Sequence, residues 1–150
     1  MSNIVEEYSW SAVEYAKHSS NQYEWAKELI PKLKLAGTES LLDIGCGDGK
    51  VTALLSSYLP NGHVVGIDSS DEMIAHARQS FPHCHNSNLT FLRMDARDLT
   101  FREQFDVAFS SATLHWIIDH PTVLAGVYSS LDKNGRLVFQ MAGKGNAQDV

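Results

Sequence analysis

The sequence predicts an α/β protein in which a doubly wound, mainly parallel sheet of about five strands has helices on both faces. Two observations support this fold class. Short apolar runs alternate with longer stretches of helical periodicity, and most of the apolar runs are continuous, as in strands that are buried on both faces. Such an alternation is typical of a parallel sheet whose strands are connected through helices.

The apolar runs that we predict to be strands are residues 41–44, 63–67, 89–94, 105–109 and 136–141. The last run follows Asn134 and Gly135, which favour the left-handed conformations of a turn. We expect this fifth strand to lie at an exposed edge of the sheet, where unpaired backbone groups invite self-association.

Three stretches between the predicted strands have apolar residues on one helical face, namely residues 50–59, 70–81 and 121–131. Ser69 and Glu72 have the spacing of a capping box, which predicts the start of the second of these helices. A further helix is expected over residues 22–35, bent at Pro31, after an aromatic-rich segment over residues 8–23.

Composition limits the class of protein. A chain of 150 residues, 43% of them hydrophobic, is about one domain long. The formal net charge of −6 disfavours nucleic acid and anionic membranes as partners, so small molecules are expected instead. Cys46 and Cys84 are too few for a disulfide framework, and the sequence contains neither a membrane-spanning apolar run nor a signal peptide. We therefore expect a cytoplasmic protein.

The stretch LLDIGCGDGK, residues 41–50, places three glycines at alternate positions directly after an apolar run. Such density indicates positive φ angles or the close approach of a ligand. In a parallel sheet, ligands bind at the carboxyl ends of the strands, so Gly45 and Gly47 are expected to expose backbone to one. Asp68 ends the next predicted strand, where its carboxylate can accept hydrogen bonds from ribose hydroxyls. These features together predict a cofactor that contains a nucleoside.

The same loop bears on which cofactor is bound. The dinucleotide fingerprint requires a third glycine where Lys50 stands, and the acidic Asp48 is unfavourable beside a pyrophosphate. A ligand with a sulfonium and an amino group suits the loop better. An NAD-dependent oxidoreductase and a non-catalytic cofactor-binding module remain alternatives.

These motifs resemble those of the class I S-adenosylmethionine-dependent methyltransferases, which have a Rossmann-like fold. LLDIGCGDGK resembles the first motif of the family, Asp68 resembles the acid that ends its second strand, and MDARDL resembles its third-strand motif. GIDSSDEMIAHAR and SSATLHWIIDHPTVLAGVYSSLDKNGRLVFQM are most similar to the trans-aconitate methyltransferase branch. The resemblance covers residues 41–141.

The resemblance implies that S-adenosyl-L-methionine is the cofactor and S-adenosylhomocysteine the product. It implies residues 1–38 as a helical lid segment and residues 39–150 as the Rossmann-like core of a single domain. Family members have two more strands after the fifth, so we expect this chain to be truncated at its carboxyl end, which puts its isolated activity in doubt. The implied cofactor-binding residues are Asp43, Gly45, Cys46, Gly47, Asp68, Ser69, Met73, Asp95, Ala96 and Ser111, with Tyr15, His18 and Gln22 in the lid.

Several of these residues have a second interpretation. Met73 either touches the adenine or only packs its helix, and Trp116 either lines a substrate pocket or only fills space. We expect Cys46 to fit against the methionine part of the cofactor and not to act as a nucleophile. His83 and its neighbours Cys84 and His85 could suggest a metal, but a solvated loop is the expected role and no metal is predicted.

The implied reaction is a direct in-line transfer of a methyl group to a small molecule, which the family resemblance suggests is a carboxylate. Such a transfer mainly requires that the reacting atoms be held collinear, and it requires neither a metal nor a covalent intermediate. A carboxylate acceptor is already ionised at pH 7, whereas an alcohol or amine would require a general base. His115 is the candidate base, with packing or substrate orientation as its alternative role.

Overall fold

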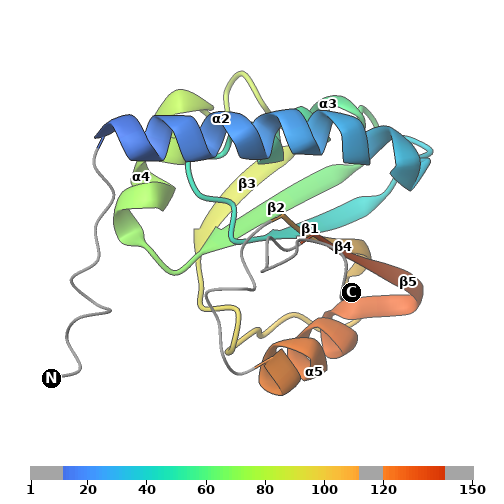
Figure 1. Ribbon diagram of the computed structural model, residues 1–150. Coiled ribbons are helices and arrows are strands. Elements are labelled where there is room, and N and C mark those ends of the chain that lie inside the picture. Colours follow the sequence, from blue (N-terminus) through green and yellow to red (C-terminus); the bar gives the residue numbers. More distant parts are fainter. Residues whose placement is uncertain (1–11, 112–119, 141–150) are drawn as a thin grey trace, which may run out of the picture.

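The computed structural model describes residues 12–111 and 120–140, with side chains over residues 20–111 and 121–139. Five parallel strands form one sheet in the order β3-β2-β1-β4-β5 (Figure 1). From β1 the chain proceeds outward to β3 and then returns to β4 on the other side of β1, so the direction of winding reverses between β1 and β4. Their bounds are β1 Ser40–Ile44, β2 His63–Asp68, β3 Leu89–Arg93, β4 Phe105–Ser111 and β5 Leu131–Gln140.

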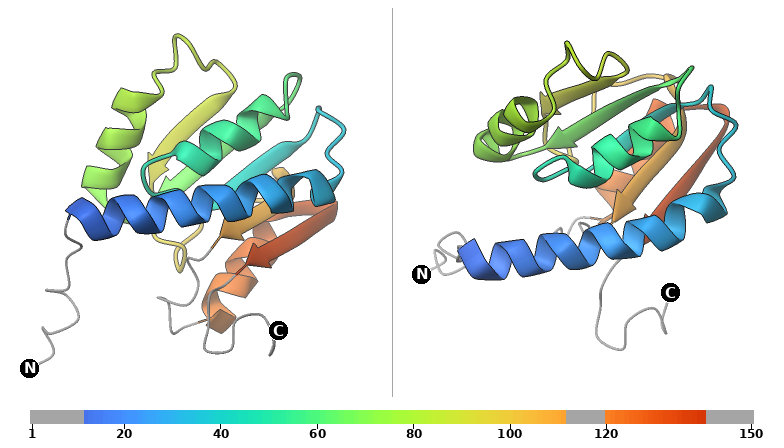
Figure 2. Two further views of the ribbon diagram at one scale, coloured as in Figure 1. Left: turned by 45° about the horizontal axis from the view of Figure 1, so that its top comes forward. Right: turned by 90° about the horizontal axis from the view of Figure 1, so that it is seen from above.

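Helices cover both faces of this sheet, as Figure 2 shows. On one face lie α2 (Ala12–Leu29), η1 (Ile30–Leu33), α3 (Lys50–Ser57) and α4 (Asp71–Ser80), and on the other lies α5 (His120–Ser130). Leu41 packs in the core with the first group, and its neighbour Leu42 packs in the core with α5, because successive strand residues point to opposite faces. The predicted fold class is confirmed.

The amino-terminal helix starts earlier than predicted. The sequence predicted a helix over residues 22–35, but α2 starts at Ala12, because residues 12–21 form a helix without a clear apolar stripe. It ends at Leu29, before Pro31, and a short 3₁₀ turn follows. Ala26, Ile30 and Leu33 are buried in the core, so this segment is packed on the sheet.

The capping box predicted at Ser69 and Glu72 is wrong by one residue. Ser70 is the N-cap of α4, with extended backbone, and its Oγ accepts a hydrogen bond of 3.2 Å from the Met73 N–H. The N–H of Ser70 in turn donates to Asp68 Oδ1 over 2.9 Å. The end of β2 therefore fixes where α4 begins.

The fifth strand also starts earlier than predicted, at Leu131. Its pairing with β4 shifts register between Phe105, which faces Leu131, and Val107, which faces Arg136. The turn predicted at Asn134 and Gly135 falls inside this irregularity. The strand lies at an edge of the described sheet, as expected, and the Arg136 guanidinium donates a hydrogen bond to the Leu33 carbonyl of η1.

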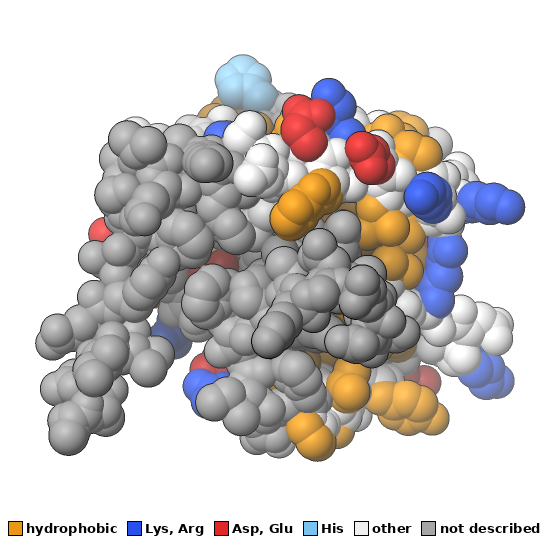
Figure 3. Space-filling view, viewed as in Figure 1, with side chains coloured by type: hydrophobic (Ala, Val, Ile, Leu, Met, Phe, Trp, Pro, Cys, Tyr) orange, Lys and Arg blue, Asp and Glu red, His pale blue; other side chains and the backbone are white. Residues whose placement is uncertain are grey.

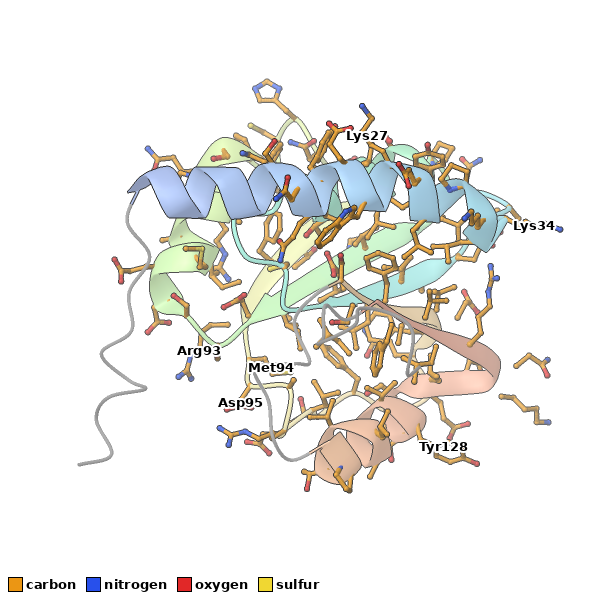
Figure 4. The ribbon with its side chains drawn as sticks, viewed as in Figure 1. Lys27, Lys34, Arg93, Met94, Asp95 and Tyr128 are labelled. Atoms are coloured by element: carbon orange, nitrogen blue, oxygen red, sulfur yellow. The ribbon has the colours of Figure 1, made fainter. Side chains whose placement is uncertain are left out.

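No helix in residues 12–111 and 120–140 is both long and apolar enough to cross a membrane. Some apolar side chains do face outward on the α5 side of the sheet. Tyr128 lies on the outer side of α5 (Figure 4), and Leu124 and Leu137 are exposed as well.

Candidate functional site

The loop between β1 and α3 has the backbone that its glycines suggest. Gly45, Gly47 and Gly49 have φ angles of 79°, 54° and 87°, a region that other residues rarely adopt. The N–H groups of Gly45 and Cys46 both donate to the Ile67 carbonyl of β2, each over 2.8 Å. The loop is therefore held at the carboxyl end of the sheet, beside the point where its winding reverses.

Two glycines let α3 approach the sheet closely. A Cβ atom on Gly49 would lie 2.8 Å from Phe91 Cζ, and one on Gly66 would lie 2.9 Å from Thr52 Cγ2. In a dinucleotide fingerprint the third glycine, at the position of Lys50, allows this close packing of helix on sheet. Here Gly49, one residue earlier, allows it instead. Gly66 lies in an apolar run of β2, and its close packing against Thr52, Cys46 and Phe91 explains why a glycine stands there.

Asp68 connects three parts of the site. Its Oδ2 accepts a hydrogen bond of 3.0 Å from the Gly47 N–H, and its Oδ1 accepts one from Ser70. Its carbonyl accepts a third bond, of 2.9 Å, from the Met94 N–H after β3. The structure therefore brings Asp68 next to Gly47, as the sequence predicted, and holds the exits of β1, β2 and β3 together.

Asp43 is a buried acid behind the glycine loop. Its side chain is 2% exposed, and its Oδ2 accepts a hydrogen bond of 2.7 Å from Thr52 Oγ1. Burial raises the pKa of Asp43 to about 7; the Thr52 bond acts in the opposite direction, and the charge of Asp68 adds to the increase. Sequence reasoning missed Thr52, a polar residue on the buried face of α3.

A pocket lies between the glycine loop, the start of α3, α2 and the end of β4. It combines six of the predicted cofactor-binding residues with three residues that the sequence did not single out as ligand contacts. The predicted ones are Gln22, Asp43, Gly45, Cys46, Gly47 and Ser111, and the others are Asp48, Lys50 and Val51.

Four other predicted residues lie outside this pocket. Ser69, Met73, Asp95 and Ala96 follow β2 and β3, and Figure 4 shows Asp95 next to Met94 at the exit of β3. The Asp95 carboxylate lies 2.8 Å from the Arg97 guanidinium, whose hydrogen bonds lower the pKa of this acid to about 2. Asp95 is thus an ionised acid near Asp68, on the side of the site away from the pocket.

The structure describes no side chain for four of the residues that the sequence singled out. For Tyr15 and His18 only the α2 backbone is described, and His115 lies outside the described residues together with Trp116.

Cys46 is buried at the site, whereas Cys84 and His83 lie in an exposed loop. Cys46 is 7% exposed, and burial with the charges of Asp43 and Asp68 raises the pKa of its thiol, which disfavours a thiolate nucleophile. Both cysteines are free thiols. His83 and Cys84 are exposed, and in the described part of the chain no cluster of His, Cys, Asp or Glu could hold a metal ion.

The charges around the loop favour a cationic ligand. Asp43 and Asp48 line the pocket, and Asp68 is bonded to Gly47. Lys50 is the neighbouring cation, with its Nζ 3.7 Å from Asp48 Oδ2. Figure 3 shows Lys and Arg side chains gathered at the end of the molecule where α2 leads into η1, and Figure 4 places Lys34 there, away from the site. A pyrophosphate would face carboxylates here, whereas a sulfonium and an ammonium group fit.

Comparison with known proteins agrees with this chemistry. A family model described as a methyltransferase domain matches residues 41–135. Trans-aconitate 2-methyltransferase of Escherichia coli is 35% identical over 132 residues, which cover 88% of this chain and 50% of that protein. An uncharacterized methyltransferase of Schizosaccharomyces pombe is 37% identical, over 98% of this chain and 56% of its own length.

The crystal structure of an S-adenosylmethionine-dependent methyltransferase from Mesorhizobium loti superposes with a TM-score of 0.66 and 29% identity, over 78% of this chain and 54% of that one. The chain thus belongs to the methyltransferase domain family, which confirms the class I resemblance and does not favour the NAD-dependent alternative. It spans about half the length of the curated relatives it matches.

Proposed function

We propose that this chain forms the cofactor-binding part of an enzyme that transfers a methyl group from S-adenosylmethionine to a small-molecule carboxylate. The observation that carries the proposal is the acidic, glycine-lined pocket of Asp43, Gly45 and Gly47, located where the winding of the sheet reverses. Family membership supports the same reading, since the Mesorhizobium loti neighbour is titled an S-adenosylmethionine-dependent methyltransferase.

Each part of the site has a role in this proposal. The cofactor supplies a methyl group on a positively charged sulfur. The exposed backbone at Gly45 and Gly47 accommodates its amino-acid tail, with Asp43 and Asp48 opposite the positive charges. Asp68 accepts hydrogen bonds from the ribose hydroxyls while it holds the loop.

The outer part of the site contacts the adenine of the cofactor and closes over the cofactor. Met73, Asp95 and Ala96, with Ser69, border the adenine, and Ser111 ends β4 at the methyl side of the pocket. Residues 1–38 act as the lid of the single domain, through Tyr15 and Gln22. Gln22 already lines the pocket, which supports the lid role for α2.

The acceptor is proposed to be a carboxylate because trans-aconitate 2-methyltransferase is among the relatives. A carboxylate is ionised at neutral pH, so the enzyme has only to orient it toward the methyl group. His115 then orients the acceptor and removes no proton. The free thiols of Cys46 and Cys84 agree with the proposed reducing, cytoplasmic setting.

Two measurements test the proposal. Calorimetry with S-adenosylmethionine, S-adenosylhomocysteine and NADH should show binding of the first two and not the third; binding of NADH alone would refute the cofactor assignment. Transfer of a labelled methyl group to a panel of small carboxylic acids, alcohols and amines then tests the acceptor. Product from carboxylates is expected. Cofactor binding without transfer to any acceptor, by this chain and by a longer chain alike, would favour a non-catalytic module.

A further inference from the structure

Asp43 has two properties that are rarely combined, since it is almost completely buried and it also lines the pocket. It lies in β1 between β2 and β4, where it pairs with Gly66 and with Phe109. A charge held in such a place interacts with a bound ligand more strongly than a surface charge does, because less water screens it. The ionisation of Asp43 can therefore influence which ligands bind.

The groups that face Asp43 are mostly acidic or neutral. From β2 comes Asp68, from the loop come Cys46 and Asp48, and from α3 comes the Thr52 hydroxyl. β4 contributes Phe109 and Ser111, and α2 contributes Gln22, none of which is charged. Lys50 lies beside Asp48, and within the described residues neither Asp43 nor Asp68 forms an ion pair. Among the residues that the structure describes, Asp43 thus has no cation paired with it.

The donor and the product of the proposed reaction differ by one charge. S-adenosylmethionine carries a sulfonium, an ammonium and a carboxylate, whereas S-adenosylhomocysteine has lost the positive charge on sulfur. We infer that Asp43 is a specificity-determining residue whose carboxylate makes the pocket bind the methyl donor more tightly than the demethylated product. This inference rests on the proposed function, and it adds a means by which the product is released.

The inference has a pH signature. Because burial raises the pKa of Asp43 to about 7, the free protein holds a proton there below neutral pH. A bound cation favours the ionised carboxylate, so binding of the donor releases that proton, and its affinity increases with pH. The product lacks the sulfonium and should release fewer protons. The ratio of donor to product affinity is therefore expected to rise with pH.

Isothermal titration of this chain with each ligand separately, at pH 6 and pH 7.5, tests the inference. For the wild-type protein the donor-to-product affinity ratio should increase by up to about tenfold over this range, from the titration of one group near pH 7. Titrations in two buffers of different ionisation enthalpy should show more proton release for the donor than for the product.

Asp43→Asn keeps the shape and can still accept the Thr52 hydrogen bond, but it cannot ionise. This variant should bind the donor about tenfold more weakly at pH 7.5, bind the product nearly as well as the wild type, and show a ratio that no longer changes with pH. Asp132→Asn removes the same formal charge from an exposed residue of β5 and should leave all of these values unchanged. Any pH dependence from the ligands' own amino groups persists in both variants and can be subtracted.

Thr52→Val is a second variant, which keeps the inference testable if Asp43→Asn does not fold. It leaves Asp43 in place and removes only the hydroxyl that donates a hydrogen bond to it. It should raise the pKa of Asp43 further and move the pH at which the affinity ratio changes upward. The inference would be overturned if the affinities for both ligands depended equally on pH, or if Asp43→Asn weakened the binding of both ligands equally. The proposed function would still stand. If neither ligand binds to folded wild-type protein, the proposed function fails as well.

Discussion

The main-chain N–H of Gly47 donates a hydrogen bond of 3.0 Å to Asp68 Oδ2, which connects the exit loop of β1 to the end of β2. The same carboxylate accepts the N–H of Ser70 through its other oxygen, at the start of α4. One acidic side chain thus organises two loops that the sequence separates. A ligand that binds at this edge of the sheet therefore meets loops whose backbone is already held in place.

Replacing Asp68 by Asn should weaken cofactor binding. One of the two N–H groups at Gly47 and Ser70 would then face an amide NH₂ in place of an oxygen, and one of the two oxygens proposed to accept from the ribose hydroxyls would become a donor. We expect at least a tenfold increase in the dissociation constant of S-adenosylmethionine, about 1.4 kcal/mol, measured by calorimetry. Asp71→Asn, at an exposed acid in the first turn of α4, is the control. Equal affinities in all three proteins would contradict the role of Asp68.

Replacing Gly49 by Ala should destabilise the fold. The new Cβ would lie 2.8 Å from Phe91 Cζ, and the residue would have to keep a φ of 87°. We expect the free energy of unfolding to fall by about 1 to 3 kcal/mol, measured by urea denaturation. Gly126→Ala in α5 is the matched control, because its Cβ would meet Leu99 at 3.4 Å in ordinary helical backbone, and it should raise stability by up to about 1 kcal/mol. Similar effects of the two substitutions would refute this account of Gly49.

The burial of Asp43 should make the ligand-free protein less stable as the pH increases. Its pKa is raised from the ordinary 3.8 to about 7, so the folded state binds a proton that the unfolded state has lost between these values. The unfolding free energy therefore decreases as the pH rises through this range and is constant above it. The free energy of unfolding of Asp43→Asn, taken relative to that of the wild type, should rise by about 2 to 3 kcal/mol between pH 4.5 and pH 8. Thermal or urea denaturation at each pH measures it. A stability difference that does not change with pH would show that Asp43 is not protonated near neutral pH.

Substitution of His115 tests the orienting role proposed for it. A general base contributes about 10² to 10⁴ in rate, whereas a carboxylate acceptor requires none. With a carboxylate substrate, His115→Gln should therefore change kcat by less than about tenfold and leave its pH profile unaltered. His76→Gln, an exposed position on α4, is the control. A loss of 10² or more in kcat for His115→Gln on the carboxylate substrate, with the control unaffected, would contradict the purely orienting role proposed for His115.

The order of elements and the main components of the site could be predicted without a structure. Continuous apolar runs identified all five strands, and the glycine loop with Asp68 identified the edge of the sheet at which the pocket lies, because both patterns are local in the chain. The errors were at boundaries. Ser69 in place of Ser70 as the N-cap, and residue 136 in place of Leu131 as the start of β5, depend on where neighbouring strands end.

By itself the sequence determined that a parallel sheet forms and that Gly45, Gly47 and Asp68 lie at the carboxyl ends of its strands, because strand periodicity and loop backbone are set by neighbouring residues. Only the tertiary structure decided that Thr52 bonds to Asp43 and that Gly49 and Gly66 allow α3 to approach the sheet. These contacts join residues from different elements, so they exist only after β1, β2 and α3 have packed together. The same packing removes Asp43 from water and raises its pKa, a property that the order of residues alone does not contain.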